Sequence, residues 1–382
     1  MDDWGDFYYG RSCPKWSVTE NATIPCIRYG ELYTKFGAKI DRVYSYTNMP
    51  PENLRFSKGT EVLIPRVGED PMDYNHCTWL SMPDIAIGEM ISVFNTDNNP
   101  LFTATMFNAT LQNDFAMRVE GGSVTNLYFE KLKNIEVSFP SILEQEKIAA
   151  YFEDLDHLIT LHQRKCEETK KLKKYMLQKM FPQNGQTVPE IRFAGFTDAW
   201  EQRKLEVFGK ATGGTSIESE FSEDGIYKVI SIGSYSENSV YNDQGIRAIK
   251  SDKTSNRVLN QNDLTMILND KTTSGNIIGR VLLIEESGIY VYNQRTERIE
   301  INLDEYDPVF LYEMLNAPNI REKIIKQAQG NTQIYVNWTA ISLLEYMIPS
   351  KEEQVKIGEY LHSISNLITL HHRKYTDTLK AP

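Results

Sequence analysis

The sequence LITLHQRK at residues 158–165 returns almost unchanged as LITLHHRK at residues 367–374, 209 positions further along the chain. The match extends to both sides of this segment. Residues 140–171 align without a gap to residues 349–380, and 16 of these 32 positions are identical. A duplication of this length indicates an architecture that is built twice within one chain.

Each copy has the features of a long helix. Pro140 and Pro349 stand just before the helical pattern, where proline is tolerated. A serine followed three residues later by a glutamate gives each copy a capping-box pattern. Apolar residues then recur at heptad spacing, which predicts a coiled-coil seam with a histidine in it. The predicted seam consists of Ile148, Tyr151, Leu155, Leu158, His162, Ile357, Tyr360, Ile364, Leu367 and His371.

The first helix is expected to run from about residue 144 to residue 180, and the second to be shorter, at about 29 residues. Core helices of one ordinary globular domain are the alternative. The length of the first helix and its basic distal half favour a helical partner instead, and the other repeat is the obvious one. Because the second globular segment begins at the far end of the first helix, we expect antiparallel packing about a pseudo-two-fold axis.

The duplication divides the chain into four segments. Residues 1–139 form a first globular domain, 140–182 a first helix, 183–347 a linker and second globular domain, and 348–382 a second helix. Outside the helices the globular segments match mainly in shape: residues 24–36 and 227–239 each give a short apolar strand, a glycine and an aromatic loop. Residues 59–71 and 261–280 each give a strand and then a polar loop. The expected fold class is α+β, with two tandem globular domains separated by two long helices in an antiparallel coiled coil.

Composition narrows the class of protein. No apolar run approaches the roughly 20 residues of a membrane helix, and the acidic N-terminus lacks the features of a signal peptide. The four cysteines form no C-x-x-C pair, which favours reduced thiols in a cytoplasmic protein without a metal site. The net charge is −11, and the two globular segments carry −6 and −7 of it while each helical segment carries +1.

The chain resembles the specificity subunit of Type I restriction–modification enzymes over essentially its whole length. The resemblance rests on the helix starts LEQEKIAAYF and EEQVKIGEYL, the duplicated LITLH-x-RK, the helix end KKLKKYMLQKMFP and the linker VPEIRFAGFTDAWEQRKL. The glycine-led stretches at Gly121 and Gly330 add to it. The first globular segment has no counterpart of VPEIRFAGF, and the second helix has none of KKYMLQKMF.

The resemblance implies a non-catalytic DNA-binding subunit. Each globular domain would be a target-recognition domain that reads one half of a bipartite, asymmetric site on double-stranded DNA, and half-sites one helical turn apart would be roughly 34 Å apart. The helices would set the gap and dock two methyltransferase (modification) subunits, and two restriction subunits are further candidates. No cofactor is expected in this chain, because S-adenosylmethionine, ATP and Mg would be bound by the partner subunits. A coiled-coil adaptor whose globular domains bind protein is the alternative.

DNA contacts favour Arg, Lys, Asn, Gln and Thr side chains on loops. In the first globular segment the candidates are Arg11, Lys15, Arg28, Tyr29, Tyr33, Lys35 and Arg66. In the second they are Lys271, Thr272, Thr273, Ser274, Asn293, Arg295, Asn331 and Gln333. An ordinary solvated loop residue is the alternative for each. Because both segments are acidic, we expect the isolated chain to bind DNA weakly and the methyltransferase subunits to supply phosphate contacts.

Other motifs carry no catalytic prediction. The stretch GKATGGTS at residues 209–216 has the wrong order for a phosphate-binding loop and reads as a turn. No adenine-methylation tetrad or S-adenosylmethionine motif is present. The heptad positions of His162 and His371 favour a polar pair that fixes the helix register over a catalytic role, and Cys166 is expected to be an inert helix residue.

Overall fold

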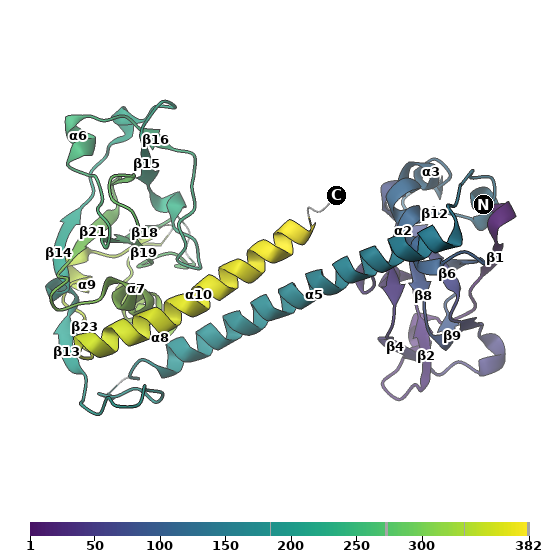
Figure 1. Cartoon of the computed structure of the whole chain (residues 1–382), viewed down its shortest axis with the longest axis horizontal. Helices are drawn as coiled ribbons and strands as arrows, with labels where there is room; N and C mark the ends of the chain where they lie inside the picture. Colours follow the sequence, from purple (N-terminus) through teal and green to yellow (C-terminus); the bar gives the residue numbers. More distant parts are fainter. Residues whose placement is uncertain (184, 272–273, 332, 380–382) are drawn as a thin grey trace. The chain divides into compact units, whose positions relative to one another are not determined.

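The computed structural model describes residues 1–183, 185–271, 274–331 and 333–379, and the chain divides into two compact units, residues 1–158 and 159–382 (Figure 1). Each unit combines sheets with helices, which confirms the α+β class. None of the helices in the described parts of the chain has the length and apolarity that crossing a bilayer requires.

The first unit consists of short strands, a few helices and the start of one long helix. Its strands are β1 (Asp6–Tyr9), β2 (Ile24–Ile27), β3 (Lys39–Ile40), β4 (Ser45–Thr47), β5 (Phe56–Lys58), β6 (Glu61–Pro65), β7 (Val67–Gly68), β8 (Thr78–Leu80), β9 (Pro83–Ile87), β10 (Ile91–Asn95), β11 (Glu120–Gly121) and β12 (Thr125–Asn126). Its helices are α1 (Tyr29–Thr34), α2 (Pro100–Thr110), α3 (Gln112–Ala116), α4 (Phe129–Leu132) and α5 (Ile142–Lys179), which continues into the second unit.

Strand β6 explains how the first unit builds its core. All five of its residues are buried. In agreement with this, its sequence EVLIP is apolar at every position after the first and does not alternate between apolar and polar residues. Because side chains of a strand point to opposite faces in turn, Val62 and Ile64 enter a cluster with Phe107 and Phe115. Leu63 enters the cluster on the other face. The sheet that contains β6 is thus covered on both sides.

The second unit contains the rest of the long helices and the second globular fold. Its strands are β13 (Glu201–Lys204), β14 (Gly209–Gly213), β15 (Tyr227–Ile230), β16 (Arg247–Ala248), β17 (Leu264–Ile267), β18 (Asn269–Asp270), β19 (Val281–Leu283), β20 (Tyr290–Tyr292), β21 (Thr296–Ile301), β22 (Ile334–Tyr335) and β23 (Glu345–Ile348). Its further helices are α6 (Asp252–Ser255), α7 (Pro308–Asn316), α8 (Pro318–Ile325), α9 (Trp338–Ile341) and α10 (Lys351–Leu379).

The two units repeat one sheet topology although their sequences have diverged. The strand order β1-β10-β6-β8 in the first unit corresponds to β14-β21-β17-β19 in the second. The pairs among these four strands are antiparallel in both units. The first unit adds β3, which pairs parallel with β8. A second sheet contains one parallel pair in each unit, β2 with β9 and β15 with β20. The strands expected in residues 24–36, 227–239, 59–71 and 261–280 are present as β2, β15, β6 and β17.

A buried glutamine joins each long helix to its globular fold by the same contacts. Gln145 is 1% exposed, accepts a hydrogen bond from the backbone N–H of Asn99 at 2.9 Å and donates to the carbonyl of the proline before its helix at 2.9 Å. Gln354 is also 1% exposed and makes these two contacts with Asp307 at 2.9 Å and with its own preceding proline at 3.0 Å. Asn99 and Asp307 are the N-caps of α2 and α7. The duplication therefore extends to individual hydrogen bonds.

The long helices agree with the sequence in length and, within the second unit, in direction. Helix α5 has 38 residues and α10 has 29. From Ile159 onward α5 runs antiparallel to α10 (Figure 1): the rings of His162 and His371 lie 5.8 Å apart, and Cys166, one turn further, points its sulfur at the carbonyl of Ile368. Burial, followed by the charge of Lys374, lowers the pKa of His162.

The apolar seam itself differs from the prediction. Ile148 packs against the first globular fold, and Ile357 and Tyr360 pack into the core of the second. Ile364 is buried and Leu155 is half-buried. Three other predicted seam residues are exposed, namely Tyr151, Leu158 and Leu367. The prediction that Ile148, Ile357 and Tyr360 belong to the helix–helix seam is wrong, because the start of each helix uses its apolar stripe to hold a globular domain.

Candidate nucleic-acid interface

In the second unit a short strand pair brings together two polar segments that are distant in sequence. Strand β18 pairs antiparallel with β22, with Asp270 opposite Ile334. The segment after β18 and the turn before β22 therefore leave the sheet side by side. This places four predicted residues near one another, all of them exposed: Lys271, Ser274, Asn331 and Gln333. The predicted Thr272 and Thr273 lie outside the described residues.

The first unit uses the same scaffold with different side chains. Strand β7 pairs with β12, with Gly68 opposite Thr125. Gly121, the last residue of β11 before the turn into β12, adopts φ 127°. Gly330, before β22, adopts φ 100°, and both conformations favour glycine. The segment after β7 is acidic, since it contains Glu69, Asp70 and Asp73. The equivalent loops of the two units therefore differ in chemistry.

Two further predicted residues of the second unit, Asn293 and Arg295, differ in exposure. Asn293 is 6% exposed, and its side-chain oxygen accepts a hydrogen bond from the backbone N–H of Ile217 at 3.1 Å. The prediction of a DNA contact from Asn293 is therefore wrong, because its amide holds two loops together inside the fold. Arg295 is exposed and adopts φ 68°, a left-handed conformation that is unusual for arginine.

Three predicted residues of the first unit have structural roles that the sequence does not reveal. Arg28 caps α1, and its backbone N–H donates to the carboxylate of Glu31 at 2.8 Å. Tyr33 is half-buried and donates its hydroxyl hydrogen to the carbonyl of Val67 at 3.0 Å. Arg66 is half-buried, with its guanidinium 4.6 Å from the ring centre of Tyr9. The contacts of Tyr33 and Arg66 commit much of those two side chains to the fold, whereas Arg28 makes its contact through the backbone.

The remaining predicted residues of the first unit lie on its surface. Arg11, Lys15, Tyr29 and Lys35 are exposed. Trp16, which follows Lys15, is 72% exposed, a large value for an aromatic side chain. An exposed aromatic beside a cation is a common feature of surfaces that contact nucleic acid.

The sequence analysis missed an aromatic and basic cluster around Tyr44. This ring is 45% exposed, with the ammonium of Lys35 at 5.7 Å and the guanidinium carbon of Arg42 at 5.4 Å from its centre. Tyr46, in the short strand β4 that begins directly after Tyr44, is 42% exposed. The signal was present as the interleaved basic and aromatic residues of KIDRVYSY, but only the fold brings Lys35 to the same ring.

At the equivalent place in the second unit, two cations pair with a carboxylate. Strand β16 takes the position of β4, since it pairs with β15 as β4 pairs with β2. There Arg247 and Lys228 both bind the carboxylate of Asp243, at 2.9 Å and 3.2 Å. Hydrogen bonds from Arg247 hold the pKa of Asp243 below its usual range. The two units therefore present different electrostatic surfaces from equivalent strands.

The described residues contain no group of three or more His, Cys, Asp or Glu side chains placed to hold a metal ion. The four cysteines are buried and unpaired. The surface built by these loops can contact a ligand through hydrogen bonds, charge and aromatic stacking.

Comparison with known proteins identifies the family. The family model of the Type I restriction modification DNA specificity domain matches residues 87–171 and 197–381, which is more than half of the chain. The chain belongs to this family.

A curated relative and two solved structures are similar to the chain. The Type I restriction enzyme MjaVIII specificity subunit of Methanocaldococcus jannaschii is 26% identical over 272 residues, and the match covers 69% of this chain and 63% of that protein's length. The crystal structure of a Type I restriction–modification S subunit from M. genitalium matches 99% of this chain and 91% of that chain, with 13% identity and a TM-score of 0.63.

The second structure comes from work on complex assembly and conformational transition of the Type I system. It covers 99% of this chain and 92% of that chain, with 13% identity and a TM-score of 0.51. At this identity the two structures establish a shared fold.

Proposed function

We propose that this chain is the DNA-specificity subunit of a Type I restriction–modification complex, in which each globular fold reads one half of a bipartite, asymmetric DNA site. The observation that carries the proposal is one sheet topology built twice with different loop chemistry at equivalent places. A repeated scaffold suits two tasks of one kind, and different loops suit two different targets. Family membership supports the same reading.

The long helices would set the gap between the half-sites and dock two methyltransferase subunits. Large apolar side chains support the docking role, because Leu172, Tyr175, Leu367 and Leu370 are each more than 40% exposed on the helices. The chain would be non-catalytic and would act in the cytoplasm. S-adenosylmethionine, ATP and Mg would be bound by the partner subunits, and restriction subunits are further candidate partners.

Methylome sequencing of a host that expresses this chain with its cognate methyltransferase tests the proposal. A new bipartite, asymmetric methylated motif that is absent from a host without the chain is the expected result. If a complex forms and no motif appears, the DNA-reader proposal fails, and the adaptor that binds protein through its globular folds takes its place.

A double substitution tests whether the first fold reads DNA through the Tyr44 cluster. Lys35→Ala with Arg42→Ala should weaken methylation, because the variant loses two cations beside an exposed ring. Lys147→Ala is a control for the loss of an exposed cation elsewhere in the chain, since Lys147 lies on α5. Uniform weakening over all sites would indicate phosphate contacts, and relaxation of one half-site would indicate base contacts. Equal methylation by the double variant and the control would remove the cluster from the interface.

A further inference from the structure

The second unit contains a basic cleft that the proposed function does not use. Its volume is about 770 Å³, and it lies between the distal part of α5, helix α10 and the end of α7. Five lysine and arginine residues line it against two glutamates, with one histidine, although the whole chain carries a net charge of −11. The basic residues are Lys170, Lys173, Lys174, Arg280 and Arg373, and the histidine is His372.

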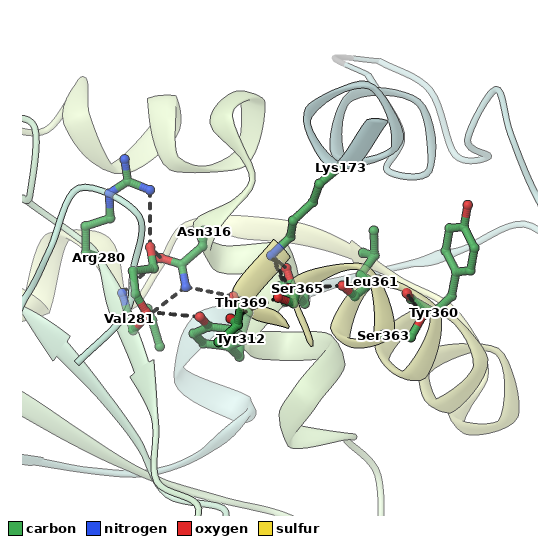
Figure 2. Close-up of polar contacts among 12 residues, drawn as sticks. Lys173, Arg280, Val281, Tyr312, Asn316, Tyr360, Leu361, Ser363, Ser365 and Thr369 are labelled. Atoms are coloured by element: carbon green, nitrogen blue, oxygen red, sulfur yellow. Dashed lines mark hydrogen bonds and ion pairs between the residues drawn. The ribbon is translucent and has the colours of Figure 1, made fainter. Parts of the chain in front are cut away.

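The two glutamates of the cleft are already engaged. Glu313 is 1% exposed and accepts hydrogen bonds from the ammonium of Lys173 and the hydroxyl of Ser365, the side chains that meet in Figure 2. Glu237 accepts a hydrogen bond from the side-chain amide of Asn276 at 2.8 Å. Lys170 is also paired, with Glu167 at 2.9 Å. Among the described residues, Lys174, Arg280 and Arg373 form no ion pair, so the lining keeps an excess of positive charge over the one remaining carboxylate, Glu237.

Arg280 is the most buried of the lining cations that form no ion pair among the described residues. It is half-buried, and its guanidinium donates to the hydroxyl of Ser239 and to the carbonyl of Asn276, both at 3.2 Å. These acceptors are neutral, and no described carboxylate forms an ion pair with it. Burial lowers the pKa of Arg280. The charge of Glu237 opposes this lowering only in part. Because a half-buried cation without an ion-pair partner is costly, an anion in the cleft would reduce an existing penalty.

The side of the cleft that holds Arg280 is fixed by a network of hydrogen bonds around Ser239. Ser239 is 4% exposed and adopts φ 61°, a strained conformation for serine. Its hydroxyl donates to the side-chain oxygen of Asn316 at 2.7 Å, and Asn316 also binds the backbone of Val281 (Figure 2). The hydroxyl of Tyr312 donates to the carbonyl of Ser239 at 3.0 Å. This network fixes the hydroxyl of Ser239, which accepts a hydrogen bond from the guanidinium of Arg280.

We propose that this cleft binds a phosphate-bearing anion, with Arg280 as its anchor and Lys174 and Arg373 as further contacts. The volume falls within the roughly 300–1,000 Å³ typical of small-molecule sites. A guanidinium fork with several ammonium groups suits the multiple oxygens and charges of a phosphate. A neighbouring cleft of about 290 Å³ is lined by Glu285 and Glu286, which confines an anion to the basic side.

The phosphate could belong to a free nucleoside polyphosphate or to a nucleic-acid backbone, and a binding experiment separates these sources. The full-length chain is titrated calorimetrically at low salt with pyrophosphate, with ATP and with a short DNA duplex of arbitrary sequence. Variants Arg280→Ala and Arg373→Ala are compared with Lys210→Ala, a control that removes an exposed lysine of β14. We expect each cleft variant to bind at least about tenfold more weakly, as for the loss of one hydrogen bond to a charged group.

Dependence of ATP or pyrophosphate binding on Arg280 and Arg373 would support a free phosphate ester. Dependence of duplex binding alone would support a phosphodiester backbone. The proposal is overturned if none of the three probes binds at millimolar concentration, or if both cleft variants bind like the Lys210 control. Should Arg280→Ala fail to fold, Arg373→Ala and Lys174→Ala, both at exposed positions, decide the question. The ATP arm does not depend on the proposed DNA recognition, so either proposal can fail alone.

Discussion

Replacing Lys173 by methionine should destabilise the second unit, because Lys173 neutralises a carboxylate that is almost fully buried. Its ammonium lies 2.8 Å from Glu313, whose side chain is 1% exposed, whereas that of Lys173 is 21% exposed. It also donates to the hydroxyl of Ser365 on α10 at 2.7 Å. Breaking a buried ion pair costs about 3–5 kcal/mol. Because Lys173 is partly solvated, we expect about 3 kcal/mol, the lower end of that range.

The assay is urea denaturation, with hydrogen exchange to locate the effect. Exchange should accelerate in α7 and α10, the two helices that Lys173 connects to α5. Lys174→Met is the matched control, since the neighbouring Lys174 is exposed and pairs with no described carboxylate. The double variant Lys173→Met with Glu313→Gln should recover part of the loss, because it removes the orphaned charge. A loss below about 1 kcal/mol, or no recovery in the double variant, would refute a buried ion pair that holds the helices together.

Three further predictions concern buried polar groups. Gln354→Ala and Gln145→Ala should each destabilise their own unit by about 2 kcal/mol, because each leaves the backbone N–H of an N-cap residue unpaired. Unchanged hydrogen exchange in α7 for the first variant, or in α2 for the second, would contradict this prediction. Burial raises the pKa of Glu297 to about 7, above its unfolded value of about 4.5, so the wild type should lose stability as pH rises through about 7. Glu297→Gln should therefore be more stable by up to about 3 kcal/mol at pH 8.5, with the gain shrinking at pH 5 in urea titrations. The pKa of His162 is lowered by burial and by Lys374, His371 and Lys165, so stability should fall as pH drops below about 6.5, and thermal melts of His162→Asn should show a smaller fall.

The sequence determined the features of this protein that depend on regular local patterns. The duplicated segment predicted two long helices, and α5 and α10 are present with close to the expected lengths. The pairing of His162 with His371 follows from the same register, because equivalent residues of two antiparallel repeats meet near their common midpoint. The short apolar runs gave β2, β6, β15 and β17, since a buried strand needs little more than a few consecutive apolar residues.

Tertiary structure alone decided which polar and apolar residues are available for contacts. Asn293 looks like a loop amide in sequence, yet it is buried, and its side-chain oxygen accepts a hydrogen bond from the backbone N–H of Ile217, which is distant in sequence. Tyr151 and Ile148 occupy equivalent-looking heptad positions, but the first is exposed and the second packs on a globular fold. Lys35 joins Arg42 at one ring only after β4 is placed beside α1. Such outcomes depend on long-range packing, which periodicity and composition do not encode, because each position reports only its own side chain and near neighbours.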